Sequence, residues 1–126
     1  MRFAFDFFGT LETLPEVRDV ARLLHAHGHE IHVVSALSPG LYFDYKSALV
    51  ALDVPVTAIH VCDHVPALKV EILKQLEAAG FWDDVPENIA AARTAGFAAC
   101  WAGHEPATEL RKVKVHVVEP LKGVQS

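Results

Sequence analysis

The chain of 126 residues is long enough for one domain with a hydrophobic core and too short for two. Its 52% of apolar and 21% of charged residues are typical of a globular protein, and a formal net charge of -5 argues against a general affinity for nucleic acid. Since no apolar stretch is long enough to span a bilayer and the start reads as a strand rather than a signal peptide, we expect a cytoplasmic protein without membrane contacts.

Short apolar runs alternate with segments of helical periodicity along the whole chain. In chain order the expected elements are strand 2–7, helix 15–27, strand 30–36, helix 42–52, strand 58–62, helix 66–80, strand 80–83, helix 86–96, strand 97–102, a short helix 106–112 and strand 114–118. The glycines at 28, 80 and 96 are expected to end the helices that precede them. This alternation predicts an α/β fold with a parallel sheet and helices on both faces.

Polar side chains follow three of the predicted strands at the point where each strand ends. They are Asp6, Ser35 and the pair Asp83–Asp84. Ligands of parallel α/β sheets bind beyond the carboxyl ends of the strands, so these residues are candidates for one site. Asp6 can act as a carboxylate nucleophile or accept hydrogen bonds in the turn before Gly9, and Ser35 can bind a phosphoryl oxygen or cap a turn.

The stretch from residue 83 to residue 96 combines an acidic pair with a helix start. Asp84 is placed to cap the helix, with Pro86 in the first turn and Glu87 completing a capping box. That leaves Asp83 at the strand end, beside Asp6 if the two strands are neighbours. Carboxylates gathered in this way suit Mg²⁺ and would repel one another without a cation. Lys69, near the start of the preceding helix, can pair with Asp6 or with a bound phosphate, or can be a solvated lysine.

Four segments in this order resemble the signatures of the haloacid dehalogenase (HAD) superfamily of hydrolases and phosphatases. They are FDFFGTL at 5–11, HVVSA at 32–36, Lys69 and WDDVPENIAAARTAG at 82–96. The resemblance covers most of the chain and implies a single Rossmann-like, three-layer domain, which we place at residues 1–119 with a loose tail at 120–126. It also implies that the first strand is central, between the second strand and the one that carries Asp83.

The resemblance implies a role for each matching residue. Asp6 would be the nucleophile that becomes an aspartyl-phosphate, and Lys69 would neutralise it. The residues implied in phosphate binding are Thr10, which also supports the loop, Ser35, Ala36 and Lys69. The ligands implied for a Mg²⁺ cofactor are Asp6, the backbone carbonyl of Phe8, Asp83 and Asp84.

Phe8 departs from the pattern of the phosphatases that the chain resembles. The residue two positions after the nucleophile is usually a second aspartate, which protonates the leaving group and then activates water. Phenylalanine can do neither, and general acid–base help of this kind is commonly worth ~10²–10⁴ in rate. We therefore expect slow hydrolysis, or another group in this role, for which His64, Asp63 and Asp44 are conceivable.

An aromatic residue at this position also resembles the 2-haloacid dehalogenases, which act on carbon without a metal. Those enzymes close the site with a cap, whereas the segments between Asp6 and Ser35 and between Ser35 and Lys69 are too short to hold one. The chain resembles a capless member with an open site, which favours a large, even macromolecular, phosphorylated substrate or a homo-oligomer that covers the site.

Our first hypothesis is thus a Mg²⁺-dependent phosphohydrolase. The alternatives are a non-catalytic protein that binds phosphate or metal, and a dehalogenase-like hydrolase.

Overall fold

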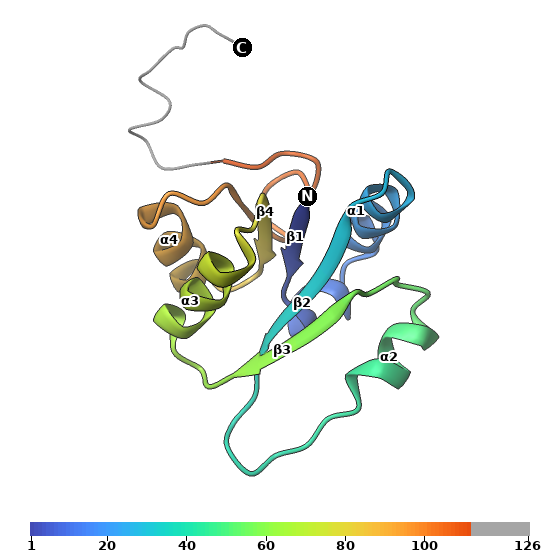
Figure 1. The fold of residues 1–126 in the computed structure, drawn as a ribbon, viewed down its shortest axis with the longest axis horizontal. Helices are drawn as coiled ribbons and strands as arrows, with labels where there is room; N and C mark the ends of the chain where they lie inside the picture. The colour runs from blue at the N-terminus through green and yellow to red at the C-terminus, as the bar shows by residue number, and fades with distance from the viewer. Residues whose placement is uncertain (112–126) are drawn as a thin grey trace, which may run out of the picture.

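Strand β1 (Arg2–Phe5) lies at the centre of a five-stranded parallel sheet in the computed structural model, which describes residues 1–111 (Figure 1). The strand order is β3-β2-β1-β4-β5. The other strands are β2 (Glu30–Ala36), β3 (Ala58–Cys62), β4 (Gly80–Asp83) and β5 (Ala99–Trp101). The sheet confirms the predicted α/β class and the Rossmann-like architecture with a central parallel sheet.

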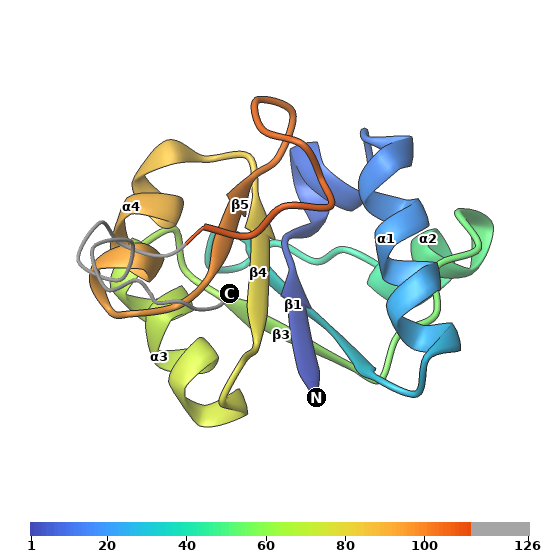
Figure 2. The same ribbon diagram turned by 90° about the horizontal axis from the view of Figure 1, so that it is seen from above.

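Helices cover both faces of this sheet, as Figure 2 shows from above. Helices α1 (Pro15–Ala26) and α2 (Tyr45–Ala51) pack on one face, and α3 (Pro66–Leu76) and α4 (Pro86–Thr94) pack on the other. A wide turn, η1 (Phe7–Leu11), joins β1 to α1. Among residues 1–111, no helix combines the length and the apolar character needed to cross a membrane.

The sheet register explains why the site residues meet. Phe5 of β1 is paired with Val33 of β2 on one side and with Trp82 of β4 on the other. The next residue along β1 is Asp6, and the next along β4 is Asp83, so both aspartates come to the same edge of the sheet. The predicted central position of the first strand, between β2 and the strand that carries Asp83, is confirmed.

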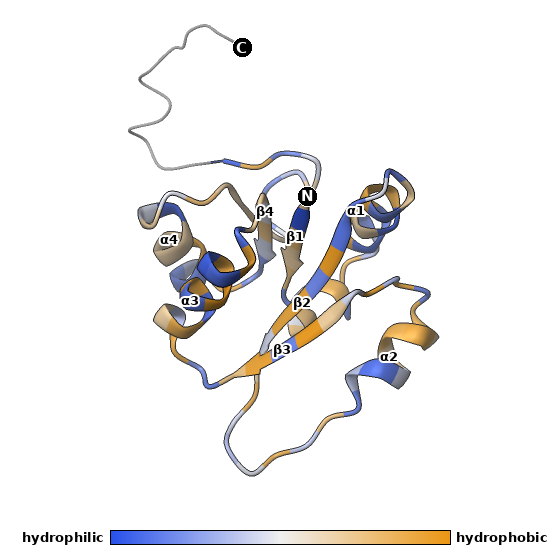
Figure 3. Cartoon of the chain, in the orientation of Figure 1, coloured by the Kyte–Doolittle hydropathy of each residue, from blue (hydrophilic) through white to orange (hydrophobic). Residues whose placement is uncertain are grey.

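Alternation along the strands divides the buried apolar residues between two cores, one on each face. Phe5 stacks on Trp82 at 4.4 Å between ring centroids in the core under α1 and α2, while Phe81 and Val34 face α3 and α4. In Figure 3 apolar colour predominates in β2 and β3 and is interrupted there by polar residues. The two-sided burial of the central strands is typical of parallel sheets.

Several predicted elements differ in their bounds from the structure. The strand expected at 2–7 ends at Phe5, and Phe7 already belongs to η1. The helices expected at 15–27 and 86–96 end slightly earlier, at Ala26 and Thr94.

The helix expected at 66–80 ends at Leu76, because Glu77 takes a left-handed conformation (φ 52°) that turns the chain into β4. The helix expected at 42–52 begins only at Tyr45, where Asp44 caps it by accepting hydrogen bonds from the backbone and hydroxyl of Ser47. The strand expected at 97–102 is shorter, at Ala99–Trp101.

The helix expected at 106–112 is wrong for residues 106–111, which form turns instead. The chain is held there by single contacts: the Ala107 carbonyl accepts a hydrogen bond from Trp82 Nε1 at 2.8 Å, and Arg111 bridges to Ala99. These contacts come from residues far away in sequence, so local periodicity could not reveal them. The expected strand 114–118, the domain boundary at 119 and the tail lie outside the described residues.

Candidate active site

The backbone holds Asp6 at the carboxyl edge of the sheet. Its N–H donates to the Trp82 carbonyl at 2.8 Å, which extends the pairing of β1 with β4 by one residue. The chain then leaves the sheet through η1, in which the N–H of Leu11 donates to the Asp6 carbonyl at 3.3 Å. Asp6 is only 5% exposed, so its carboxylate is placed by a strand end and a turn that are both hydrogen-bonded.

Gly9 allows η1 to approach the loop after β4. It has a φ of +75°, in the left-handed region that glycine adopts readily. A Cβ atom at this position would overlap the carboxylate of Asp84. The sequence FFGTL therefore needs glycine here for two reasons, the backbone conformation and the space that the Asp84 side chain occupies.

We expect Gly9→Ala to lower the free energy of unfolding by more than the ~1–2 kcal/mol that a left-handed non-glycine residue costs, because Asp84 must also move. Gly28→Ala is the matched control: Gly28 has a φ of +88°, and a Cβ atom added there would meet nothing within 4 Å. Urea unfolding of both variants measures the difference. Equal losses of stability in the two variants would contradict the contact between Gly9 and Asp84.

Lys69 links two aspartates at the strand ends. Its Nζ lies 2.8 Å from Oδ1 of Asp6 and 2.8 Å from Oδ2 of Asp83. The lysine extends from the first turns of α3, which begins at Pro66, and is only 3% exposed. The structure thus brings Asp6, Lys69 and Asp83 together as the sequence predicts and makes Lys69 a buried partner rather than a solvated lysine.

Burial and charge shift the ionisation of this group in opposite directions. Burial, followed by the charge of Asp83, raises the pKa of Asp6 to about 8, although Lys69 acts against this shift. For Lys69, burial acts to lower the pKa, but the charges of Asp6 and Asp83 outweigh it and the pKa is raised. Lys69 therefore stays an ammonium ion, and its charge lies 2.8 Å from an oxygen of each aspartate.

Asp83 rather than Asp84 organises the start of α4. Its Oδ1 accepts a hydrogen bond from the Val85 N–H at 2.8 Å and its Oδ2 accepts one from Asn88 Nδ2 at 3.0 Å. The predicted capping box of Asp84 and Glu87 is wrong, since Val85 is the N-cap and no side chain caps α4, whereas Pro86 does lie in the first turn. Asp84 is consequently free to turn toward η1.

Thr10 joins the two acidic loops. Its hydroxyl lies 3.1 Å from Oδ1 of Asp84 and 3.4 Å from Oδ2 of Asp6. Because a hydroxyl has one proton to donate, it orients one carboxylate at a time and does not neutralise either. Thr10 is fully buried and links η1 to the loop after β4 through its hydrogen bond with Asp84.

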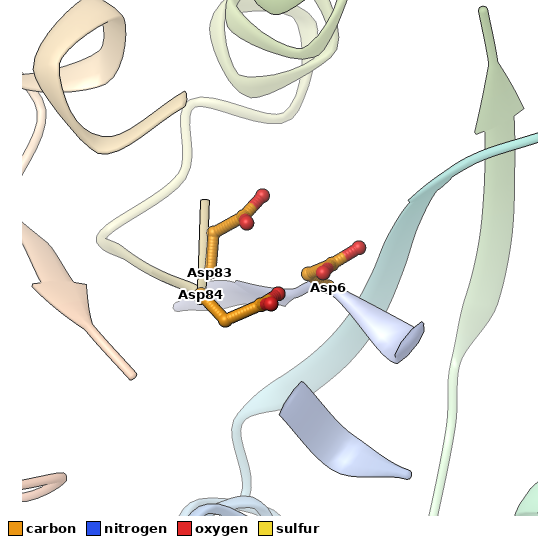
Figure 4. A group of neighbouring side chains, drawn as sticks. All are labelled: Asp6, Asp83 and Asp84. Carbon is orange, nitrogen blue, oxygen red and sulfur yellow. The ribbon is translucent and has the colours of Figure 1, made fainter. Parts of the chain in front are cut away.

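The three aspartates form a candidate metal site (Figure 4). One carboxylate oxygen from each of Asp6, Asp83 and Asp84 lies within 4.8 Å of the others. The cluster holds three carboxylates and only one ammonium ion, from Lys69, so it lacks positive charge. An all-oxygen donor set at a buried, negatively charged point fits Mg²⁺.

The Ser35 hydroxyl is hydrogen-bonded to Tyr45. Ser35 is fully buried near the end of β2, and its Oγ lies 2.9 Å from the hydroxyl of Tyr45 at the start of α2. Ala36, the last residue of β2, lines a pocket together with Lys69. Of the residues implied in phosphate binding, the structure therefore brings Thr10, Lys69 and Ala36 to the carboxylate side and engages the Ser35 hydroxyl with Tyr45.

Phe8 belongs to an aromatic cluster on the α2 side of the site. Its ring packs edge-on against Phe43 at 4.9 Å and Phe7 at 5.0 Å, and it lies 5.8 Å from the ring of Tyr45. Its backbone is extended, with φ of -68° and ψ of 129°. The aromatic side chain therefore has a packing role here, and the function of its carbonyl as a metal ligand remains a prediction.

A pocket of about 240 Å³ opens beside Lys69, between the ends of β2 and β3 and the starts of α3 and α4. Of the residues suggested as substitutes for the missing acid, Asp63 and His64 line this pocket. Asp44 caps α2 instead, through its two hydrogen bonds with Ser47. The structure thus leaves Asp63 and His64 as the candidates near Lys69.

Comparisons with known proteins show the fold. No protein-family model and no curated protein matches the sequence. Among solved structures, the chain is similar to the D,D-heptose 1,7-bisphosphate phosphatase from B. bronchiseptica complexed with magnesium and phosphate. The two share 18% sequence identity and a TM-score of 0.55, over 78% of each chain. The chain shares the fold of this phosphatase.

Three residues of the site have no assigned role in the sequence analysis. The Asn88 side-chain amide donates a hydrogen bond to Asp83, and the hydroxyls of Tyr45 and Ser35 are hydrogen-bonded to each other. Trp101 Nε1 donates to the Asp84 carbonyl at 3.0 Å. Asn88 lies in the Pro-Glu-Asn segment at 86–88, so its position one helical turn beyond the aspartates was a usable signal. Tyr45 and Trp101 are brought to the site by α2 and β5, and no local pattern marks such contacts.

Proposed function

We propose that the chain is a capless, HAD-type, Mg²⁺-dependent phosphohydrolase that acts through an aspartyl-phosphate on Asp6. The observation that carries the proposal is the placement of the Asp6 carboxylate, 2.8 Å from the Lys69 ammonium and within a cluster of three aspartates, at the carboxyl edge of the sheet. A buried carboxylate with a fixed ammonium beside it can act as the nucleophile on a phosphoryl group, and a bound metal ion would supply the positive charge that the three aspartates leave missing.

Asp6, Asp83 and Asp84 would hold the Mg²⁺ ion, with the Phe8 carbonyl as a further ligand. When bound, the ion supplies positive charge that offsets the negative charge of the phosphoryl oxygens. Asn88 and the Val85 N–H keep Asp83 in place, and Thr10 and the Trp101 indole keep Asp84 in place. The hydrogen bonds around both aspartates support a rigid donor set, which a small cation requires.

In the first step a carboxylate oxygen of Asp6 attacks phosphorus, and the bond from phosphorus to the alcohol oxygen breaks. Lys69 binds a phosphoryl oxygen, and its charge favours the ionised form of Asp6 against the opposing effects of burial and of Asp83. The departing alcohol oxygen takes a proton from water or from a pocket residue such as His64. Water then attacks the phosphorus of the aspartyl-phosphate and gives its proton to solvent or to the group that protonated the alcohol. The bond from phosphorus to the Asp6 oxygen breaks, which releases inorganic phosphate and restores Asp6.

Phe8 is the reason to expect slow turnover. Both proton transfers of the reaction lack the carboxylate that the phosphatases of this superfamily place two residues after the nucleophile. The Phe8 side chain packs on Phe43 and Tyr45, so no other group takes its place at this point of η1. Water and pocket residues must then move the protons without a positioned acid.

We expect Phe8→Asp to raise the turnover of p-nitrophenyl phosphate at least about tenfold, because general acid–base catalysis contributes ~10²–10⁴ when the group is well placed. Phe8→Asn is the matched control, since it makes the same change in packing without an ionisable group. The steady-state rate with saturating Mg²⁺ is the measurement. A similar rate in both variants would show that the acid is not what the wild-type chain lacks.

The short connections support an open site. The chain runs from β1 to β2 through η1 and α1 alone, and from β2 to β3 through α2 alone. Without a cap, the edge of the sheet is accessible to a phosphorylated group on a large molecule, and a second copy of the chain could cover it. Both a macromolecular substrate and a homo-oligomer are part of the proposal for this reason.

A specific observation favours the second candidate, a non-catalytic protein that binds phosphate or metal. Phe8 and Ser35 both contact Tyr45. The residue at the position of the expected general acid and the hydroxyl expected to bind phosphate are thus both used in packing and hydrogen bonding rather than in catalysis. The third candidate, a dehalogenase-like hydrolase, is disfavoured by three clustered aspartates, which repel one another in a metal-independent site.

Hydrolysis of p-nitrophenyl phosphate with Mg²⁺ or with EDTA tests the proposal. A phosphohydrolase of this kind releases p-nitrophenol only with Mg²⁺. We expect the rate of the wild type to be low, because Phe8 stands where a general acid is needed. A chain that binds Mg²⁺ in calorimetry without any release supports the binding protein. Release of halide from a 2-haloacid in EDTA would support the dehalogenase-like hydrolase instead.

A further inference from the structure

The pocket beside Lys69 is placed to receive the alcohol part of a phosphate ester. Its lining includes Lys69 and Asn88, which both donate a hydrogen bond to Asp83. It is also lined by Ala36 at the end of β2. A phosphoryl group bound at Asp6 and Lys69 would therefore lie next to this pocket, and the ester's alcohol part can extend into it.

Size limits what the pocket can hold. Its volume of about 240 Å³ is below the ~300–1,000 Å³ of pockets that enclose drug-sized ligands. Apolar side chains of Val65, Pro66 and Val85 form part of the lining. The pocket suits a few carbon atoms with one polar group, or one end of a longer molecule that leaves the site through its open side.

The charged residues of the pocket are mostly acidic. Asp63, at the end of β3, and Glu87, in the first turn of α4, both line it and are exposed. Lys69 is the only lysine or arginine among the lining residues, and its ammonium already lies 2.8 Å from both Asp6 and Asp83. The lining therefore offers no free lysine or arginine for a second anionic group.

We infer that the site selects phosphate monoesters whose alcohol part is neutral or cationic, and disfavours those that carry a second phosphate or a carboxylate. This inference rests on the proposed phosphohydrolase function. Repulsion from Asp63 and Glu87 acts against an anionic alcohol part, and specificity often depends on such a repulsive element. The phosphatase that shares this fold is named for a bisphosphate, so the two proteins would differ in substrate class.

Three small phosphate esters with the same two-carbon chain test the charge preference. Ethanolamine phosphate has a cationic end, ethyl phosphate a neutral end and 2-phosphoglycolate an anionic end. Each competes with acetyl phosphate for the labelling of Asp6 in the full-length chain with Mg²⁺, followed by intact-mass spectrometry. Because competition measures binding, the slow chemistry expected from Phe8 does not obscure the result.

We expect ethanolamine phosphate to inhibit labelling about tenfold more tightly than 2-phosphoglycolate at low salt, with ethyl phosphate between them. The difference shrinks at high salt, because the pocket carboxylates are exposed. The double variant Asp63→Asn, Glu87→Gln reduces the difference to less than about twofold. Glu16→Gln, an exposed carboxylate at the start of α1 on the other face of the sheet, leaves it unchanged.

Two other outcomes separate the inference from the proposed function. If Asp6 is labelled but 2-phosphoglycolate competes as well as or better than ethanolamine phosphate, the charge preference is overturned and the phosphohydrolase stands. If acetyl phosphate does not label Asp6 at all, the proposed function fails and the inference falls with it. A charge preference that persists in the Asp63→Asn, Glu87→Gln variant overturns the assignment to this pocket.

Discussion

Asp6→Asn is expected to abolish Mg²⁺-dependent phosphohydrolase activity, with a loss of about 10⁴-fold or down to the detection limit. The asparagine amide is close in size to the carboxylate but is a poor nucleophile and carries no charge to hold a cation. Removal of a nucleophile in other enzymes costs rate factors of this order. The measurement is the rate of p-nitrophenol release with Mg²⁺, in the wild type and the variant.

Stability separates this loss from unfolding. Asp6 is buried beside Asp83, and repulsion between the two carboxylates opposes folding in the absence of a metal. We therefore expect Asp6→Asn to unfold at the same urea concentration as the wild type or at a higher one when Mg²⁺ is absent. Asp19→Asn, an exposed aspartate on α1, is the control and should change neither property. Full activity in Asp6→Asn would exclude Asp6 as the nucleophile.

Lys69→Met has the largest expected effect on stability. It leaves Asp6 and Asp83 buried with no ammonium between them, and breaking a buried pair in this way typically costs about 3–5 kcal/mol. Lys74→Met, in the same helix but exposed, is the matched control and should change the free energy of unfolding by less than about 0.5 kcal/mol. Urea unfolding in EDTA gives both values.

A double variant tests whether the cost arises from the aspartates. Lys69→Met combined with Asp6→Asn removes one of the two stranded charges, so the loss should be smaller than in Lys69→Met alone. Saturating Mg²⁺ should likewise recover part of the stability, because the ion binds only the folded chain. If Lys69→Met is no worse than Lys74→Met, the ammonium does not hold the carboxylates together as described.

Much of the fold was predictable because strong local patterns agree with the tertiary structure. The strands at 30–36, 58–62 and 80–83 have the predicted bounds, since each is a short apolar run between turn residues. The central position of β1 followed from the resemblance and was confirmed by its pairing with β2 and β4. The predicted helix bounds were less accurate. Helix α3 ends where Glu77 adopts a left-handed backbone conformation, and α2 begins where the Asp44 side chain caps it. Hydrophobic periodicity reveals neither feature.

The candidate site was predictable where its residues lie at strand ends. Phe5 of β1 is paired with Trp82 of β4, so the residues that follow them, Asp6 and Asp83, lie side by side at one edge of the sheet. The error at Asp84 has a physical cause: Asp83 supplies the hydrogen bond to the Val85 N–H, and Asp84 is held by Thr10 instead. The direction of the Ser35 hydroxyl depends on Tyr45, ten residues away, which no spacing rule predicts.

Intact-mass spectrometry after incubation with acetyl phosphate tests the central claim most directly. With Mg²⁺, the wild type should gain one phosphoryl group. Hydroxylamine should then release phosphate and leave an aspartyl hydroxamate, so that the chain loses the phosphoryl mass but stays slightly heavier than the unmodified chain. The same treatment in EDTA, or of Asp6→Asn with Mg²⁺, should leave the mass unchanged. A wild-type chain that binds Mg²⁺ but never carries the phosphoryl group, or an adduct that persists in Asp6→Asn, would contradict catalysis through Asp6.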